Sequence, residues 1–190
     1  MTGPHGSYDL VVYRATPAGI IAAITASRLS LACLLVEPTG RIGGMMTSGL
    51  NAADILNDSL INGVALEFFR NVRDEYGMSV LPARIESRMA LKVFRRMLSE
   101  SRVELVLNKD MGNVTRQGTT LTSCTVGNDQ ILARWWMDAT YEGDLMHKAG
   151  IPFRVGRESA DEFGESFAGR QAFRPMLPWA SRMAIDPREG

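Results

Sequence analysis

Residues 8–37 contain two short apolar runs separated by a turn and a stretch of small residues. The runs, Leu10–Tyr13 and Cys33–Val36, have the length and composition of buried strands. A helix is expected between them, from about Ala18 to Leu29, after a turn at residues 14–17. Strand, tight turn, helix and strand in this order predict a βαβ nucleotide-binding unit, in which a phosphate group lies at the N-terminus of the helix.

An acidic residue ends the second strand of this unit. Glu37 lies 21 positions after Thr16, close to the ~20 positions at which such units place the residue that binds the ribose hydroxyls. Thr16 can cap the helix, Pro17 suits its first turn, and the helix also carries small residues where close packing on the strand is needed. The N-terminus of the helix is therefore expected to face a pyrophosphate through Ala15, Thr16, Pro17, Ala18 and Gly19.

The glycine pattern of the turn is degenerate. A G-x-G-x-x-G motif would place glycine at positions 14, 16 and 19, but only Gly19 is glycine. Arg14 is the main departure, because a non-glycine residue costs about 1–2 kcal/mol if the turn requires a positive φ there. The Arg14 side chain lies where a cofactor phosphate would approach, and it either blocks the site or pairs with the phosphate. The sequence leaves both alternatives open.

A glycine-rich segment at residues 39–49 follows Pro38. Its glycines allow the backbone to approach another group closely, which suits either a surface loop or a cofactor contact. Because the segment directly follows the βαβ unit, cofactor contact is the favoured interpretation. A later junction, Asp138-Ala139-Thr140, leads from a strand into a helix, and its backbone amides are also candidates to face a cofactor. For the acidic cluster Asp138, Glu142 and Asp144, helix capping is a simpler role than catalysis.

The remaining pattern predicts two helices, a third strand and a meander. Helices are expected at about 63–76, with Gly77 as a stop, and at about 86–99, followed by a strand at 103–107. Residues 111–126 read as a small antiparallel meander with turns at 117–118 and 127–128, and a strand at 130–137 precedes a helix at about 142–149. The basic residues of the second helix are expected to form a solvated face. The predicted fold class is α/β: a Rossmann-like βαβ domain with an inserted small antiparallel β-meander.

Four segments, in order, resemble a known family. They are YDLVVYRATPAG at 8–19, VEPTGRIGGMMTSGL at 36–50, MDATYEGDL at 137–145 and VGRE at 155–158. The chain is similar to the N-terminal half of the FAD-dependent oxidoreductases related to heterodisulfide-reductase A-type and fumarate-reductase-like flavoproteins, some of them labelled xanthan lyase. The resemblance implies FAD as cofactor and flavin-mediated hydride transfer on a small-molecule substrate. It also implies cofactor contacts for Arg41, Gly43, Gly44, Met45 and Met46 near the flavin, and for Met111 near the adenine.

Composition limits the alternatives. The net charge of zero gives no reason to expect binding to nucleic acid or to an acidic membrane surface. Two cysteines and two histidines are too few for an iron–sulfur cluster or a clear metal site, and Cys33 is expected to be a packed thiol. With no apolar run of about 18 residues and no signal-peptide pattern at the N-terminus, a cytoplasmic protein is the expectation.

Three parts are expected along the chain: a tail at 1–7, a dinucleotide-binding domain at 8–150, and the start of a substrate-side region at 151–190. Two alternatives to an FAD-dependent enzyme remain open. The chain is either a truncated, non-catalytic relative whose site is weak or needs a second chain, or an NAD-binding module, because a βαβ unit suits either dinucleotide. The glycine-rich segment and the meander favour FAD. The catalytic residues are unknown.

Overall fold

The computed structural model describes residues 6–50, 52–53, 57–166 and 168–169. The chain divides into two compact units, residues 1–152 and 153–190, and each is described by itself. The first unit carries the α/β fold, and the predicted fold class is confirmed.

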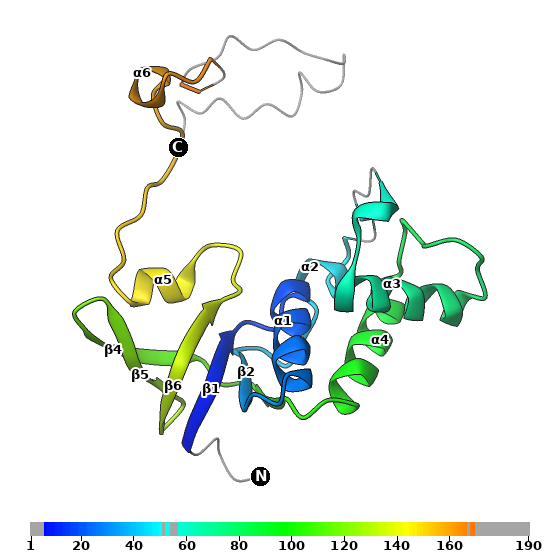
Figure 1. Ribbon diagram of the computed structural model, residues 1–190, viewed down its shortest axis with the longest axis horizontal. Coiled ribbons are helices and arrows are strands. Elements are labelled where there is room, and N and C mark those ends of the chain that lie inside the picture. Colours follow the sequence, from blue (N-terminus) through cyan, green and yellow to red (C-terminus); the bar gives the residue numbers. More distant parts are fainter. Residues whose placement is uncertain (1–5, 51, 54–56, 167, 170–190) are drawn as a thin grey trace. The chain divides into compact units, whose positions relative to one another are not determined.

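Six strands form one mixed sheet in the order β3-β2-β1-β6-β5-β4 (Figure 1). The strands are β1 (Gly6–Tyr13), β2 (Cys33–Glu37), β3 (Glu104–Leu107), β4 (Met111–Gln117), β5 (Thr120–Val126) and β6 (Asp129–Asp138). The strands β3, β2, β1 and β6 are parallel, whereas β4 pairs antiparallel with β5, and β5 with β6. Strands β4 and β5 form the meander predicted at 111–126, and β6 is the strand predicted at 130–137. Strand β1 begins at Gly6, inside the expected tail, and residues 1–5 of that tail lie outside the described residues.

Helix α1 (Pro17–Arg28) connects β1 to β2, which completes the predicted βαβ unit. All five residues of β2 are buried, as expected for a parallel strand covered on both faces. Alternation along β1 and β2 sends Val12 and Leu35 to one face of the sheet, and Val11 and Leu34 to the other.

The first face of the sheet is covered by helices α1, α3 (Gly63–Tyr76) and α4 (Ser87–Ser99) (Figure 1). Two short helices, α2 (Gly44–Thr47) and η1 (Asp58–Leu60), lie in the sequence between β2 and α3. Helix α3 has the predicted bounds and ends at Gly77, whose φ of 64° is the left-handed conformation of a helix C-cap. Phe68 of α3 and Phe94 of α4 stack with their ring centroids 4.2 Å apart. This aromatic pair joins the two helices in the larger of two apolar cores.

The basic face of α4 is largely solvated, as expected. Arg88, Lys92 and Arg95 are exposed, and Lys92 and Arg96 reach back to Glu75 of α3 at 2.5 and 2.6 Å. These cations therefore link two helices, and no binding role is needed to explain them.

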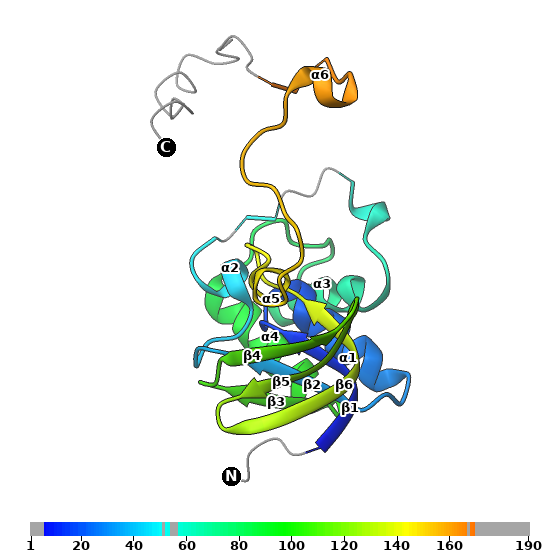
Figure 2. The ribbon, with the colours of Figure 1, turned by 90° about the vertical axis from the view of Figure 1, so that its left-hand side faces the viewer.

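The second face of the sheet is covered by the meander, which runs across β1 and β6 (Figure 2), and by helix α5 (Asp144–Lys148). Tyr13, Met111, Ile131 and Leu145 belong to this smaller core. The helix is shorter than the expected 142–149. Gly143, with a φ of 79°, precedes its first turn, and Ala149 caps its end.

Both cysteines are buried and free, and burial raises the pKa of the Cys33 thiol to about 11 and that of Cys124 to about 12. The structure therefore confirms Cys33 as a packed thiol. Within the described part of the chain, no helix is long and apolar enough to cross a membrane. No group of three or more His, Cys, Asp or Glu side chains in that part is placed to hold a metal ion.

The described residues of the second unit contain one helix, α6 (Ala160–Phe163). The Ser159 hydroxyl caps it by accepting from the Asp161 amide at 3.2 Å. Arg154 pairs with Glu162 and lies 5.7 Å from the centre of the Phe163 ring.

Candidate functional site

The ends of four parallel strands meet at one edge of the sheet. The register pairs Tyr13 with Val36 and with Asp138, and Glu37 with Leu107. From β1 the chain passes to β2 on one side, while β6 lies on the other side. Strand order therefore reverses beside β1, and in open α/β sheets ligands bind at such a point, beyond the carboxyl ends of the strands. The turn from β1 into α1 lies here.

The turn has the tight geometry that a glycine motif normally provides. Arg14 has a φ of 81°, so the positive φ anticipated at this position is present on a non-glycine residue. Its amide donates to the Val36 carbonyl at 2.8 Å. At Gly19, a Cβ atom would lie 2.1 Å from the Arg14 carbonyl oxygen and 3.0 Å from the Ala139 Cβ. The one glycine that the motif retains is therefore at a position where no side chain fits.

Thr16 fixes the start of α1. Its Oγ1 accepts from the Gly19 amide at 3.2 Å and donates to the Ala139 carbonyl at 2.8 Å. The Ala139 amide donates in turn to the Tyr13 carbonyl at 3.0 Å. These bonds hold the ends of β1 and β6 and the N-terminus of α1 together, and Pro17 occupies the first turn as predicted.

Glu37 is a buried carboxylate, only 4% exposed. Its Oε2 accepts from the Ala15 amide at 3.0 Å. Its Oε1 accepts from the Thr39 amide at 2.9 Å and from the Thr39 hydroxyl at 2.7 Å. Hydrogen bonds from the chain thus keep the charged carboxylate in place at the end of β2.

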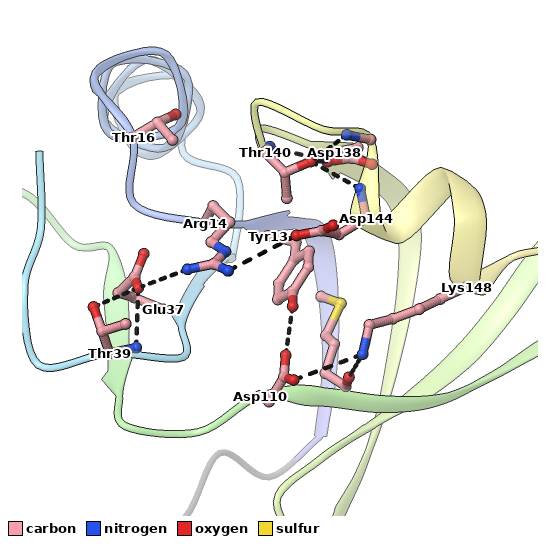
Figure 3. A network of polar contacts seen from close by, with 12 residues as sticks. Tyr13, Arg14, Thr16, Glu37, Thr39, Asp110, Asp138, Thr140, Asp144 and Lys148 are labelled. Atoms are coloured by element: carbon pink, nitrogen blue, oxygen red, sulfur yellow. Dashed lines mark hydrogen bonds and ion pairs between the residues drawn. The ribbon is translucent and has the colours of Figure 1, made fainter. Parts of the chain in front are cut away.

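The Arg14 side chain also points to Glu37. Its Nη1 lies 3.4 Å from the Glu37 Oε1, and its Nη2 lies 3.8 Å from the Asp144 Oδ2 of α5 (Figure 3). Its guanidinium lies 5.9 Å from the centre of the Tyr13 ring. The sequence left open whether Arg14 blocks the site or pairs with a phosphate, and here its partners are the carboxylates on either side of the turn.

The glycine-rich segment contacts the same turn. The Gly43 amide donates to the Ala15 carbonyl at 2.7 Å, and a Cβ on Gly44 would lie 2.3 Å from the Tyr141 Oη and 3.2 Å from the Pro17 Cδ. The predicted close approach of backbone is therefore present, although its partner here is another part of the chain. The segment contains α2, which the sequence did not indicate.

Three residues proposed near the flavin behave differently. Met45 is half exposed. Its backbone amide donates a hydrogen bond to the Tyr141 hydroxyl at 3.0 Å. Met46 packs against the larger core. Arg41 is exposed, and its Nη1 donates to the Thr47 carbonyl at 3.4 Å.

The junction after β6 is organised by Asp138. Its Oδ1 accepts from the amide and the hydroxyl of Thr140, and its Oδ2 accepts from the Met146 amide. The Thr140 hydroxyl accepts from the amides of Gly143 and Asp144 at 2.8 and 2.9 Å. The amides of Thr140, Gly143 and Asp144 are therefore bound by the chain's own side chains, and the Ala139 amide by the Tyr13 carbonyl. The expected capping role of Asp138 is confirmed.

Replacing Asp138 by asparagine should lower the stability of the chain and flatten its acid dependence. Burial acts to raise the pKa of Asp138, but hydrogen bonds from Thr140 and Met146 lower it overall. The contribution of ionised Asp138 to the free energy of unfolding is therefore fully present above the pKa of about 4 that Asp has in the unfolded chain. It is lost as the pH falls through the lower pKa that Asp138 has in the folded chain. Asparagine keeps one acceptor oxygen but turns an NH2 group toward an amide that now donates to Asp138. We therefore expect Asp138→Asn to cost about 1 kcal/mol at neutral pH, measured by urea unfolding. The exposed Asp74→Asn should cost much less, and equal costs would contradict the capping role.

Met111, expected near the adenine, is completely buried at the start of β4. Its carbonyl accepts from the Lys148 Nζ at 2.5 Å, and Lys148 lies 3.7 Å from Asp110, which accepts a hydrogen bond from the Tyr13 hydroxyl (Figure 3). Burial and this hydrogen bond raise the pKa of Tyr13. The Met111 side chain therefore belongs to the smaller core, and any contact of Met111 with a ligand would come from its backbone.

Sequence reasoning missed three residues of this region: Thr39, Tyr141 and Asp110. A threonine two residues after Glu37 is a signal for a local side-chain turn, and it was available in the sequence. Tyr141 and Asp110 reach partners 96 and 97 positions away, and local sequence gives no sign of such contacts.

The comparisons with known proteins agree with this geometry. A family model described as FAD dependent oxidoreductase matches residues 9–186. The chain belongs to the FAD-dependent oxidoreductase family. FAD is the cofactor of this family. No curated protein matches the chain.

Solved structures share the fold. THI4 of Thermovibrio ammonificans superposes with a TM-score of 0.54 at 17% identity, over 77% of this chain and 64% of that one. L-proline dehydrogenase from P. horikoshii gives 0.61 at 12% identity, over 82% and 59%. L-amino acid deaminase from Proteus vulgaris gives 0.51 at 12% identity, over 73% and 54%. The chain thus spans less than two thirds of the length of these proteins.

The described residues fit FAD at two points. Because Gly19 lacks a Cβ atom, α1 lies close to the strands, in a position where a Cβ would not fit. The amides of the first turn of α1 therefore lie at the strand ends. Glu37 presents a buried carboxylate beside that turn. Arg14 is the feature that the family's glycine motif does not contain.

Proposed function

We propose that this chain is the FAD-binding portion of an oxidoreductase acting on a small-molecule substrate. The observation that carries the proposal is the position of Glu37, a buried carboxylate at the end of β2, hydrogen-bonded to the turn that begins α1. A dinucleotide with its pyrophosphate at that turn would present its ribose hydroxyls to Glu37. The bound flavin supplies hydride transfer.

The chain's own residues would bind and orient the cofactor. We assign the pyrophosphate to the turn and first helical turn, residues 14–19, and the adenosine ribose to Glu37 and Pro38. The fixed dipole of α1 and the first-turn amides favour an anion there. The segment containing Arg41, Gly43, Gly44, Met45 and Met46 would lie near the flavin. Ala139 and Thr140 would pack near the rest of the cofactor, and the backbone at Met111 would lie near the adenine.

The four sequence segments support a relationship to the heterodisulfide-reductase A-type and fumarate-reductase-like flavoproteins. We propose that residues 8–150 form the cofactor-binding domain, that residues 151–190 begin the substrate side, and that the protein is cytoplasmic. A substrate pocket would come from protein beyond the described residues, either in the same polypeptide or in a second chain.

Glu37→Gln tests the proposal. The amide keeps the shape of the side chain but removes the charge and one acceptor, so the hydrogen bonds from a ribose are weakened. We expect FAD to bind about tenfold to a hundredfold more weakly, measured by quenching of flavin fluorescence. Glu67→Gln is the matched control, because Glu67 pairs with Arg28 on the surface at 2.6 Å and should leave the affinity unchanged. Equal affinities of Glu37→Gln and the wild type would count against the ribose role.

A further inference from the structure

The chain itself donates four hydrogen bonds to Glu37, and three of them converge on Oε1. An ionised carboxylate accepts about four hydrogen bonds. Glu37 accepts from the Ala15 amide at 3.0 Å, from the Thr39 amide at 2.9 Å, from the Thr39 hydroxyl at 2.7 Å and from Arg14 Nη1 at 3.4 Å. The three contacts at Oε1 are only partly buried, whereas the Ala15 contact at Oε2 is buried, so a ligand reaches the carboxylate at Oε1. A ribose hydroxyl that donates to Oε1 must therefore displace one of the three donors there.

Arg14 is the donor most easily displaced. The Ala15 amide belongs to the turn between β1 and α1, and Thr39 lies two residues from Glu37, so the backbone holds both donors in place. The Arg14 contact is the longest of the four, and it comes from a long side chain that is 32% exposed. Its release requires rotation of one side chain and no movement of a strand.

The Arg14 guanidinium also reaches the opposite side of the turn. Nη2 lies 3.8 Å from Asp144 at the start of α5, so the cation lies between the end of β2 and the segment after β6 (Figure 3). A glycine adopts a φ of 81° freely, so the backbone alone gives no reason for arginine at this position. What arginine contributes at this position is therefore its side chain, and not the backbone conformation of the turn.

We propose that Arg14 is an internal competitor of the cofactor ribose at Glu37: its guanidinium occupies the acceptor position that a ribose hydroxyl needs, and a dinucleotide binds fully only after Arg14 has released Glu37. This inference rests on the proposed function. The apparent Kd of the cofactor then equals its intrinsic Kd divided by the fraction of chains in which Arg14 has released Glu37. Arg14 therefore raises the cofactor concentration at which the site fills.

Arg14→Gly is the central variant, because glycine accepts the φ of this turn and removes the competing side chain. We expect FAD and ADP to bind about tenfold more tightly, the effect of removing one charge-assisted hydrogen bond. Asp144→Asn leaves Arg14 in place but removes its second partner, and it should give a smaller gain in the same direction.

A ligand without ribose hydroxyls separates this competition from simple obstruction. We would measure ADP and 2′,3′-dideoxy-ADP by isothermal titration against the wild type and Arg14→Gly. The competitor role predicts a gain for ADP and little or no gain for the dideoxy compound. An equal gain for both ligands would show that Arg14 obstructs the pyrophosphate and would overturn the proposal.

Two other outcomes would also overturn it. Weaker binding of ADP to Arg14→Gly would mean that Arg14 pairs with the phosphates, and unchanged binding would mean that it has no effect. In both cases the wild type still binds FAD, and the proposed function stands. If neither FAD nor ADP binds to the wild type or to Arg14→Gly, the proposed function fails together with this inference.

Discussion

Replacing Phe94 by alanine is expected to lower the free energy of unfolding by about 3–5 kcal/mol, the range observed when a buried aromatic side chain is truncated. Phe94 is 1% exposed and stacks on Phe68, so the cavity would open between α3 and α4. The neighbouring residues are held by the sheet and by α1 and cannot close the gap completely. Urea denaturation followed by circular dichroism measures the loss.

Phe163→Ala is the control for this prediction. Phe163 is 64% exposed in the second unit, so the same truncation removes little buried surface and should change stability by less than about 1 kcal/mol. An equally small loss of stability for Phe94→Ala and Phe163→Ala would contradict the close packing of α4 against α3 at Phe94.

Replacing Gly19 by alanine is expected to cost about 3 kcal/mol and to abolish tight cofactor binding. The added Cβ would lie 2.1 Å from the Arg14 carbonyl oxygen, which is backbone and cannot rotate away. Either α1 moves off the strands or the turn changes, and both changes displace the amides proposed to bind the pyrophosphate. Thermal unfolding and FAD titration of the same preparation measure the two effects.

Gly40→Ala provides the matched control. Its Cβ would meet only the Asn108 side chain at 3.2 Å, which can shift, and its φ is not positive. We expect nearly wild-type stability and affinity. A Gly19→Ala protein that resembles Gly40→Ala in both measurements would contradict the close approach of α1 to the turn.

The sequence predicted most of the fold because its signals are local. Gly77 ends α3 at the expected residue, the turn at Gly118 separates β4 from β5, and Glu37 ends β2. Each depends on backbone conformation or on hydrophobic periodicity over a few residues. The shortening of α5 depends on the left-handed conformation of Gly143, which the expected range included as helix.

The direction of the Arg14 side chain was not predictable in this way. Sequence spacing placed Arg14 at the turn and indicated the unusual φ, but its partners come from elements far along the chain. Glu37 lies 23 residues away at the end of β2, and Asp144 lies at the start of α5, which follows β6 in the chain. A long cation at a strand end can reach several anions, and only the assembled sheet determines which of them it contacts.

Equilibrium dialysis of the purified chain against FAD and, in parallel, against NAD would test most directly whether this is an FAD-binding protein. The visible flavin absorption retained with the protein measures FAD, and the ultraviolet absorption of the dialysate measures NAD. We expect saturable binding of about one FAD per chain, with NAD bound more weakly. No retained FAD, or a preference for NAD, would contradict this expectation.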